Sequence, residues 1–218
     1  MPYVMTVDQR RSSRSPDLVE QALTQLADVP TVLPFERTAG DELQGVLGDP
    51  MSVVDAILSL VRTGRWHIGV GIGEVERPLA VSSRAGRGPA FSRARQAVEA
   101  AKRRPQHLAV RGDDGCGAEQ ADAVLTLLAA VVERRSPAAW QAIDLDDDGL
   151  SPAETAAKLG ISRQAVAQRL GVALHHQERS ARAAAARLLA LAEAPPSAPS
   201  ALAEAPPSAP SALAEAPA

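Results

Sequence analysis

The chain has 218 residues, a formal net charge of −3 and one cysteine. This length is enough for one large or two small domains. The single cysteine excludes an intrachain disulfide and a zinc site built from cysteines. The negative net charge argues against a protein that coats nucleic acid through its overall charge. Since neither a signal-peptide pattern nor an apolar run long enough to cross a bilayer is present, we expect a soluble cytoplasmic protein with no membrane partner.

The first half of the chain, residues 1–113, predicts an α+β domain. Its strands alternate with segments in which apolar residues recur at helical spacing, and two strands close on a tight turn at Gly40-Asp41. The expected strands are 3–7, ending at Asp8, then 31–38, 43–47, 66–75 and 107–111. The expected helices are 15–26, 51–61 and 89–103. This order indicates an antiparallel-containing sheet with helices against one face.

The strand over residues 66–75 carries glycine at positions 69, 71 and 73, so we expect another segment to pass close to its backbone. Residues 114–135 form a connecting or dimerisation helix, because apolar residues make a broad face from Glu119 to Arg135. Such a helix either covers the sheet or pairs with a second copy of itself, and both uses stay open.

Two further groups of polar residues follow this helix. The first group is an acidic run over residues 144–148. It is not followed by the bidentate glutamate that an EF-hand needs, so we interpret it as an acidic surface turn rather than a calcium loop. His175 and His176 are adjacent and point about 100° apart on a helix, so they cannot share a metal as an i, i+4 pair would, and they are expected on the solvated surface. The acidic run consists of Asp144, Asp146, Asp147 and Asp148.

The segment around Gly160 predicts two short helices joined at a tight corner. Ser151, Pro152 and Glu154 have the chemistry of an N-cap, a first helical residue and a capping-box acid. Gly160 is expected to turn the chain in a left-handed conformation, and Ser162 to cap the second helix. The apolar residues expected between the helices are Ala156, Leu159, Ile161, Val166 and Leu170.

The second of these helices presents arginine and glutamine, which can make bidentate hydrogen bonds to purine edges in the major groove of double-stranded DNA. An ordinary helical hairpin with a solvated polar face is the alternative. Residues 140–175 resemble the DNA-reading C-terminal region of bacterial sigma factors and many small regulators. We assign residues 136–190 to an all-α helix-turn-helix DNA-binding domain. The residues expected to contact DNA are Ser162, Arg163, Gln164, Gln168 and Arg169.

Residues 191–218 repeat the unit LAEAPPSAPSA. Proline, alanine and serine in this pattern cannot build a core, so we expect an extended or disordered low-complexity tail.

DNA-binding helical pairs commonly read two half-sites, which favours a homodimer.

Carboxylates and cations of the first half outline a phosphate site. Asp8 ends the first strand, and Asp41 and Glu42 lie at the hairpin tip, so these carboxylates gather at one edge if the strands are neighbours. Such a cluster suits Mg²⁺, which takes a few carboxylates together with substrate phosphates. Ordinary turn chemistry also accounts for Asp41 and Glu42, and this alternative stays open. The loop after the first strand carries cations and a hydroxyl that can bind a phosphate. These residues are Arg10, Arg11, Ser12 and Arg14.

The strand ending in Asp8 and the segments AGDELQGVL, IGVGIGEV and RGPAFSRARQAVEAAK resemble the SatD family and, through it, the class III nucleotide cyclase and diguanylate cyclase fold. The resemblance spans nearly all of residues 3–111 and implies a ferredoxin-like, cyclase-like sheet. It implies that Asp8 and Asp41 match two acids that hold metal ions against a nucleoside triphosphate. Arg95 matches a transition-state arginine, whereas Phe91 replaces an asparagine.

The loss of such a positioned polar donor typically costs about two to three orders of magnitude in rate. We therefore expect a DNA-binding transcriptional regulator whose degenerate cyclase-like domain senses a phosphate-rich nucleotide with Mg²⁺. One alternative is an active metal-dependent nucleotidyl cyclase targeted by its DNA-binding end. Another is an interaction module that binds a polymerase.

Overall fold

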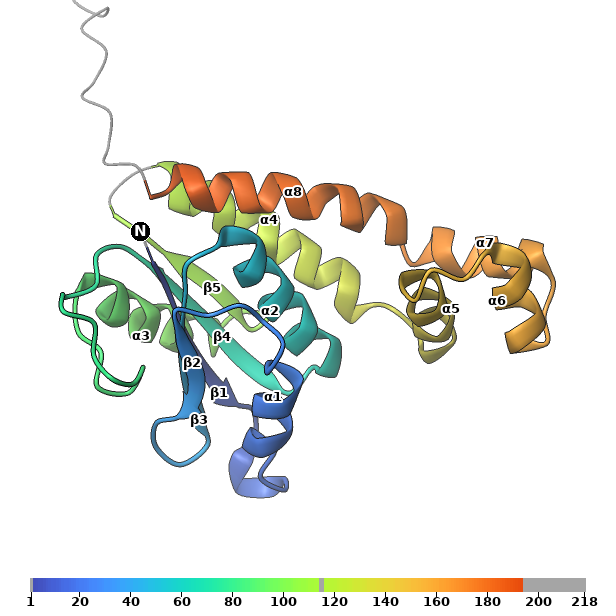
Figure 1. Ribbon diagram of the computed structural model, residues 1–218. Helices are drawn as coiled ribbons and strands as arrows, with labels where there is room; N and C mark the ends of the chain where they lie inside the picture. Colours follow the sequence, from blue (N-terminus) through green and yellow to red (C-terminus); the bar gives the residue numbers. More distant parts are fainter. Residues whose placement is uncertain (1, 114–115, 194–218) are drawn as a thin grey trace, which may run out of the picture.

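The computed structural model describes residues 2–113 and 116–193, and it combines a mixed sheet with helices on both of its faces (Figure 1). Of the predicted tail, residues 191–218, Leu191 still belongs to the last helix, and residues 194–218 lie outside the described residues. Within the described chain the sheet has the strand order β2-β3-β1-β4-β5. β1 pairs antiparallel with β3 and with β4, and β4 is parallel to β5. The strands are β1 (Tyr3–Gln9), β2 (Leu33–Arg37), β3 (Glu42–Leu47), β4 (Trp66–Ile72) and β5 (Leu108–Arg111).

The predicted helices are present with shifted ends. The first helix begins later than expected, because the Gln9 side chain holds the residues before the helix in a non-helical conformation. Gln9 Oε1 accepts from Leu18 N at 2.8 Å, and Gln9 Nε2 donates to Pro16 O at 2.7 Å. The helices are η1 (Ser12–Arg14, a 3₁₀ turn), α1 (Val19–Gln25), α2 (Pro50–Thr63), α3 (Pro89–Ala101), α4 (Cys116–Glu133), α5 (Pro137–Asp147), α6 (Pro152–Leu159), α7 (Arg163–Val172) and α8 (His175–Leu191).

Helices cover both faces of the sheet, so the prediction of helices against one face is wrong. Met5 and its odd-numbered neighbours on β1 pack into the larger core with α1, α2, α4 and α8. Val4 faces the other way and packs with Phe91 of α3. α3 connects β4 to the parallel β5 and presents a face of small residues, mainly alanine, which gives little hydrophobic signal in the sequence.

The close approach predicted from the glycines of β4 is confirmed, and its partner is α3. An ideal Cβ at Gly71 would lie 2.1 Å from Ala90 O, and one at Gly69 would lie 2.2 Å from Val98 N. A real Cβ cannot approach backbone atoms so closely. The backbone of α3 therefore packs directly on the backbone of β4, with glycine as the permitted residue at the contact.

α4 and α8 run antiparallel to one another on the opposite face, beside α2 (Figure 1). At one end an ideal Cβ on Gly117 would lie 2.9 Å from Ala192 Cα. At the other end Arg135, just after α4, donates to Glu178 of α8. α4 also contacts β5, so the structure shows the first of the two uses left open for this helix, and pairing with a second copy stays a prediction.

α5, α6 and α7 pack around a small core of their own beyond the edge of the sheet (Figure 1). The predicted inner residues Ala156, Val166 and Leu170 are buried there, and Leu159 and Ile161 pack against them. Trp140 contacts both this core and the larger one. In the described part of the chain, no helix combines the length and the apolar character needed to span a membrane.

The acidic run is largely helical rather than the expected surface turn. Ser136 caps α5 by accepting from Ala139 N at 3.2 Å, and the helix continues through Asp147 before the chain turns at Gly149. The Asp144 carboxylate accepts two hydrogen bonds from Arg62 of α2, at 2.6 and 2.7 Å. An EF-hand needs these acids on a loop, and the helix removes that loop.

Candidate functional site

The corner between α6 and α7 is built by the capping chemistry predicted for it. Ser151 Oγ accepts from Glu154 N at 3.3 Å, while Glu154 Oε2 accepts from Ser151 N at 2.8 Å, which completes the capping box. Gly160 has a φ of 64°, a left-handed conformation that costs glycine little. Ser162 Oγ then accepts from Ala165 N at 3.1 Å and starts α7. Local hydrogen bonds thus set the angle at which α7 is presented.

The outer face of α7 is polar and exposed at its N-terminal end. Arg163, Gln164 and Gln168 are exposed, whereas Ser162 uses its side chain as the cap. Arg169 is half-buried and donates to Ala138 O of α5 at 3.4 Å. The first turn of α7 has no acidic residue, so the partial positive charge of the helix start is not neutralised within that turn. This face can contact both base edges and phosphates.

The predicted carboxylates of the sheet meet at one edge, where β1 ends. Asp8 lies directly opposite Glu42 of β3, and Gln9 N donates to Asp41 O at 3.2 Å. Burial raises the pKa of Asp8, the charge of Lys102 opposes this shift, and the charge of Asp41 adds to it. Lys102 Nζ lies 3.5 Å from Asp8 Oδ2. The edge therefore holds acids together with Lys102, a cation that was not predicted as a site residue.

These three acids do not form a ready three-ligand metal site. Among the described residues, they are not a group whose ligand atoms all lie within 4.8 Å of one another. Glu42 Oε1 accepts from Thr38 Oγ1 at 2.5 Å, and Asp8 faces Lys102. Magnesium held by Asp8, Asp41 and Glu42 therefore stays a prediction that requires the side chains to rearrange.

The predicted phosphate-binding residues are spread over three places. Arg10 lies at the acidic edge, where its Nη1 donates to Gly64 O at 2.8 Å. Arg11, Ser12 and Arg14 are exposed in and around the 3₁₀ turn. Arg95 is exposed on α3, on the face of the sheet opposite α1 and α2, so the structure does not gather all five around one position.

Two histidines that were not predicted as site residues also lie at the acidic edge. His67 lies directly opposite Asp8 in the pairing of β1 with β4, and its ring meets that of His107 edge-on with centroids 4.8 Å apart. Burial, followed by the charge of His107 and then of Arg10, lowers the pKa of His67 to about 4. This imidazole is therefore neutral at pH 7. Aligning the two predicted strands would have placed His67 beside Asp8.

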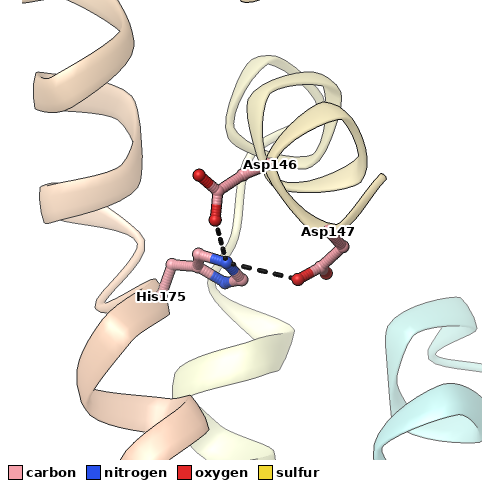
Figure 2. Close-up of side chains that lie close together, drawn as sticks. All are labelled: Asp146, Asp147 and His175. Carbon is pink, nitrogen blue, oxygen red and sulfur yellow. Dashed lines mark hydrogen bonds and ion pairs between the residues drawn. The ribbon is translucent and has the colours of Figure 1, made fainter. Parts of the chain in front are cut away.

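A second polar cluster joins α5 to α8 (Figure 2). His175 is 1% exposed, so its predicted place on the solvated surface is wrong. Its Nε2 lies 3.1 Å from Asp146 Oδ2 and 3.4 Å from Asp147 Oδ1. The two sides of the cluster are separated by 29 residues, and no local signal in the sequence could have paired them.

A buried ion pair lies close to this cluster. Arg135 Nη2 donates to Glu178 Oε2 at 3.3 Å, and their side chains are 1% and 0% exposed. Arg182 donates to Glu178 Oε1 at 2.5 Å and to Asp55 Oδ1 of α2 at 3.2 Å. These contacts join the end of α4, α8 and α2 immediately beside the α5–α7 unit.

Comparison with known proteins gives no match: no protein family, no curated protein and no solved structure is significantly similar to the chain.

Proposed function

We propose that the protein is a cytoplasmic transcriptional regulator that binds double-stranded DNA through α7 of a helix-turn-helix unit. The observation that carries the proposal is the exposed face of Arg163, Gln164 and Gln168 at the start of α7. Val166 and Leu170 on the inner side hold this helix against α5 and α6. Arginine and glutamine near the N-terminus of a recognition helix are placed to read purine edges.

The proposal extends to the sheet domain as a sensor of a phosphate-rich nucleotide, taken with Mg²⁺. The strand order β2-β3-β1-β4-β5, with a hairpin beside the first strand, supports a ferredoxin-like, cyclase-like fold and a relation to the SatD family. Asp8 and Glu42, paired across β1 and β3, support an acidic site at the edge of the sheet. Phe91 is buried against Val4 and Val46, an apolar role that favours a sensor over a cyclase.

The DNA-reading role predicts a loss of specific binding in the double variant Arg163→Ala, Gln164→Ala. Each good base contact contributes about 1–3 kcal/mol, so the loss of two contacts should lower the specific affinity by about 1.5 to 4 orders of magnitude. A gel-shift titration with fragments of the upstream region of its own gene would measure the change, at a stated salt concentration.

The matched control is Gln177→Ala, Arg187→Ala, which removes the same residue types from exposed positions of α8. This variant should bind DNA like the natural chain. If the α7 double variant also bound DNA normally, the helix would instead favour a protein partner such as a polymerase.

The sensing role is tested by repeating the titration with a panel of nucleotides and Mg²⁺. A ligand that changes DNA affinity by some factor must have its own affinity changed by DNA by the same factor. Equal DNA affinities with and without every nucleotide would leave the sheet domain a scaffold. A cyclic product from ATP or GTP that disappears in Asp41→Asn would replace the sensor with a cyclase.

A homodimer remains part of the proposal, since helix-turn-helix proteins commonly bind two half-sites. Exposed apolar side chains support it: Leu127 of α4, Val172 of α7 and Leu174 border a groove of about 420 Å³ where α4 meets α5. Sedimentation of the full-length chain would measure the state of association.

A further inference from the structure

We propose that Asp146, Asp147 and His175 bind a divalent transition-metal ion between α5 and α8. His175 Nε2 lies 3.1 Å from Asp146 Oδ2 and 3.4 Å from Asp147 Oδ1, and one ligand atom of each residue lies within 4.8 Å of the others. Two ligands about 2.1 Å from a tetrahedral ion lie about 3.4 Å apart. The three side chains are thus already close to the spacing that coordination requires.

The surroundings of the three groups are suited to holding an ion. Figure 2 shows the His175 ring pointing between the two carboxylates, which come from adjacent residues of α5. The imidazole is almost fully buried, so packing holds it in place. The Asp147 side chain is 48% exposed, which leaves an entry path and a position for a water ligand.

The ligand set selects the class of ion. One imidazole nitrogen with two carboxylates suits Zn²⁺, which often takes three protein ligands and a water. Ca²⁺ prefers six to eight oxygen ligands, and Mg²⁺ prefers an octahedral shell of oxygens. We therefore expect the site to favour Zn²⁺ over both.

Two features make the site weaker than a closed structural zinc site. Arg179 Nη1 lies 3.5 Å from Asp147 Oδ1 and 3.8 Å from Asp146 Oδ2, so its positive charge competes with the ion. Its side chain is 55% exposed and can swing into solvent. His175 Nδ1 is buried and makes no hydrogen bond with the described residues, whereas metal-bound histidines usually donate from their second nitrogen.

The position of the site gives the ion a structural consequence. α5 shares its core with α6 and α7, whereas α8 packs on α2 and α4 beside the sheet. An ion bound by Asp146 and His175 would fasten these two parts across the junction at Leu174, which has a φ of 51°. The proposal is independent of DNA binding, since the ion is held by these side chains whatever α7 contacts.

The experiment titrates the untagged full-length chain with Zn²⁺ at neutral pH, in competition with a chromophoric chelator. We expect one ion per chain, and we expect Asp147→Asn and His175→Gln each to weaken binding by at least about tenfold. Arg179→Gln should strengthen binding, because it removes the competing charge. Zn²⁺ should also raise the Tm of the natural chain but not that of Asp147→Asn.

His176→Gln is the matched control, because His176 is exposed beside His175 and should leave Zn²⁺ binding unchanged. Since loss of the buried His175 can unfold the chain, the half-exposed Asp147 provides the variant that keeps the fold. Absence of Zn²⁺ binding, or full binding retained in Asp147→Asn, would overturn the site. Equal affinity for Mg²⁺ would overturn the proposed class of ion.

Discussion

Glu178→Gln is expected to lower the free energy of unfolding by about 3–5 kcal/mol, the usual cost of leaving a buried charge without its partner. Glutamine keeps the shape of the side chain but removes the charge that faces Arg135, and both side chains are almost fully buried. Arg182 would lose the same partner. Urea denaturation followed by circular dichroism would measure the change.

Asp144→Asn is the control. It breaks the ion pair between Arg62 and Asp144, whose atoms are closer together than those of Arg135 and Glu178 but whose side chains are much more exposed to solvent. Arg62 contacts Asp144 at 2.6 and 2.7 Å, and the two side chains are 42% and 46% exposed. Solvent screens such a pair, so the expected loss is about 1 kcal/mol or less. A larger loss in Asp144→Asn than in Glu178→Gln would show that distance, rather than burial, determines the cost.

Gly71→Ala is expected to cost about 3 kcal/mol or more, at or beyond the upper end of ordinary overpacking. The new Cβ would lie 2.1 Å from Ala90 O and 2.4 Å from Ala94 N. Both are backbone atoms of α3, so no side-chain rotation relieves the contact and the whole helix must move away from β4. The midpoint of thermal or urea unfolding would report the loss.

Gly171→Ala is the control for Gly71→Ala, because the same substitution is not expected to destabilise the protein at this position. An ideal Cβ at Gly171 meets nothing within 4 Å, and the residue lies inside α7 without a positive φ. Alanine there should be neutral or should stabilise the fold by about 0.4–1 kcal/mol. Comparable destabilisation in both variants would contradict the direct packing of α3 on β4.

Several contacts attach the α5–α7 unit to the rest of the protein. Arg62 of α2 bonds Asp144, and its guanidinium lies 4.1 Å from the ring centroid of Trp140. The guanidinium of Arg135 lies 5.0 Å from the same centroid, and Arg135 Nε donates to Ala173 O at 3.1 Å. With the cluster around His175, these contacts join the α5–α7 unit to the sheet domain, and the proposed sensing would have to act through them. Mutations in these contacts are therefore informative for both proposals.

The sequence alone determined the features that depend on residues close together in the chain. The capping box of Ser151 and Glu154, the left-handed turn at Gly160 and the cap at Ser162 are local hydrogen bonds and backbone preferences, so their spacing was sufficient. The strands and most helices followed from periodicity for the same reason. The glycines of β4 predicted that another segment packs close to its backbone, but they did not identify α3 as that segment.

What lies on each face of the sheet, and which distant polar groups meet, depends on long-range packing that no short segment encodes. α3 packs through alanines against Gly69 and Gly71, a contact with almost no hydrophobic signal to predict it. His175 meets Asp146 only because the start of α8 lies against the C-terminal end of α5. Burial, which turns a histidine expected in solvent into a candidate ligand, is a property of the packed chain and not of any short segment.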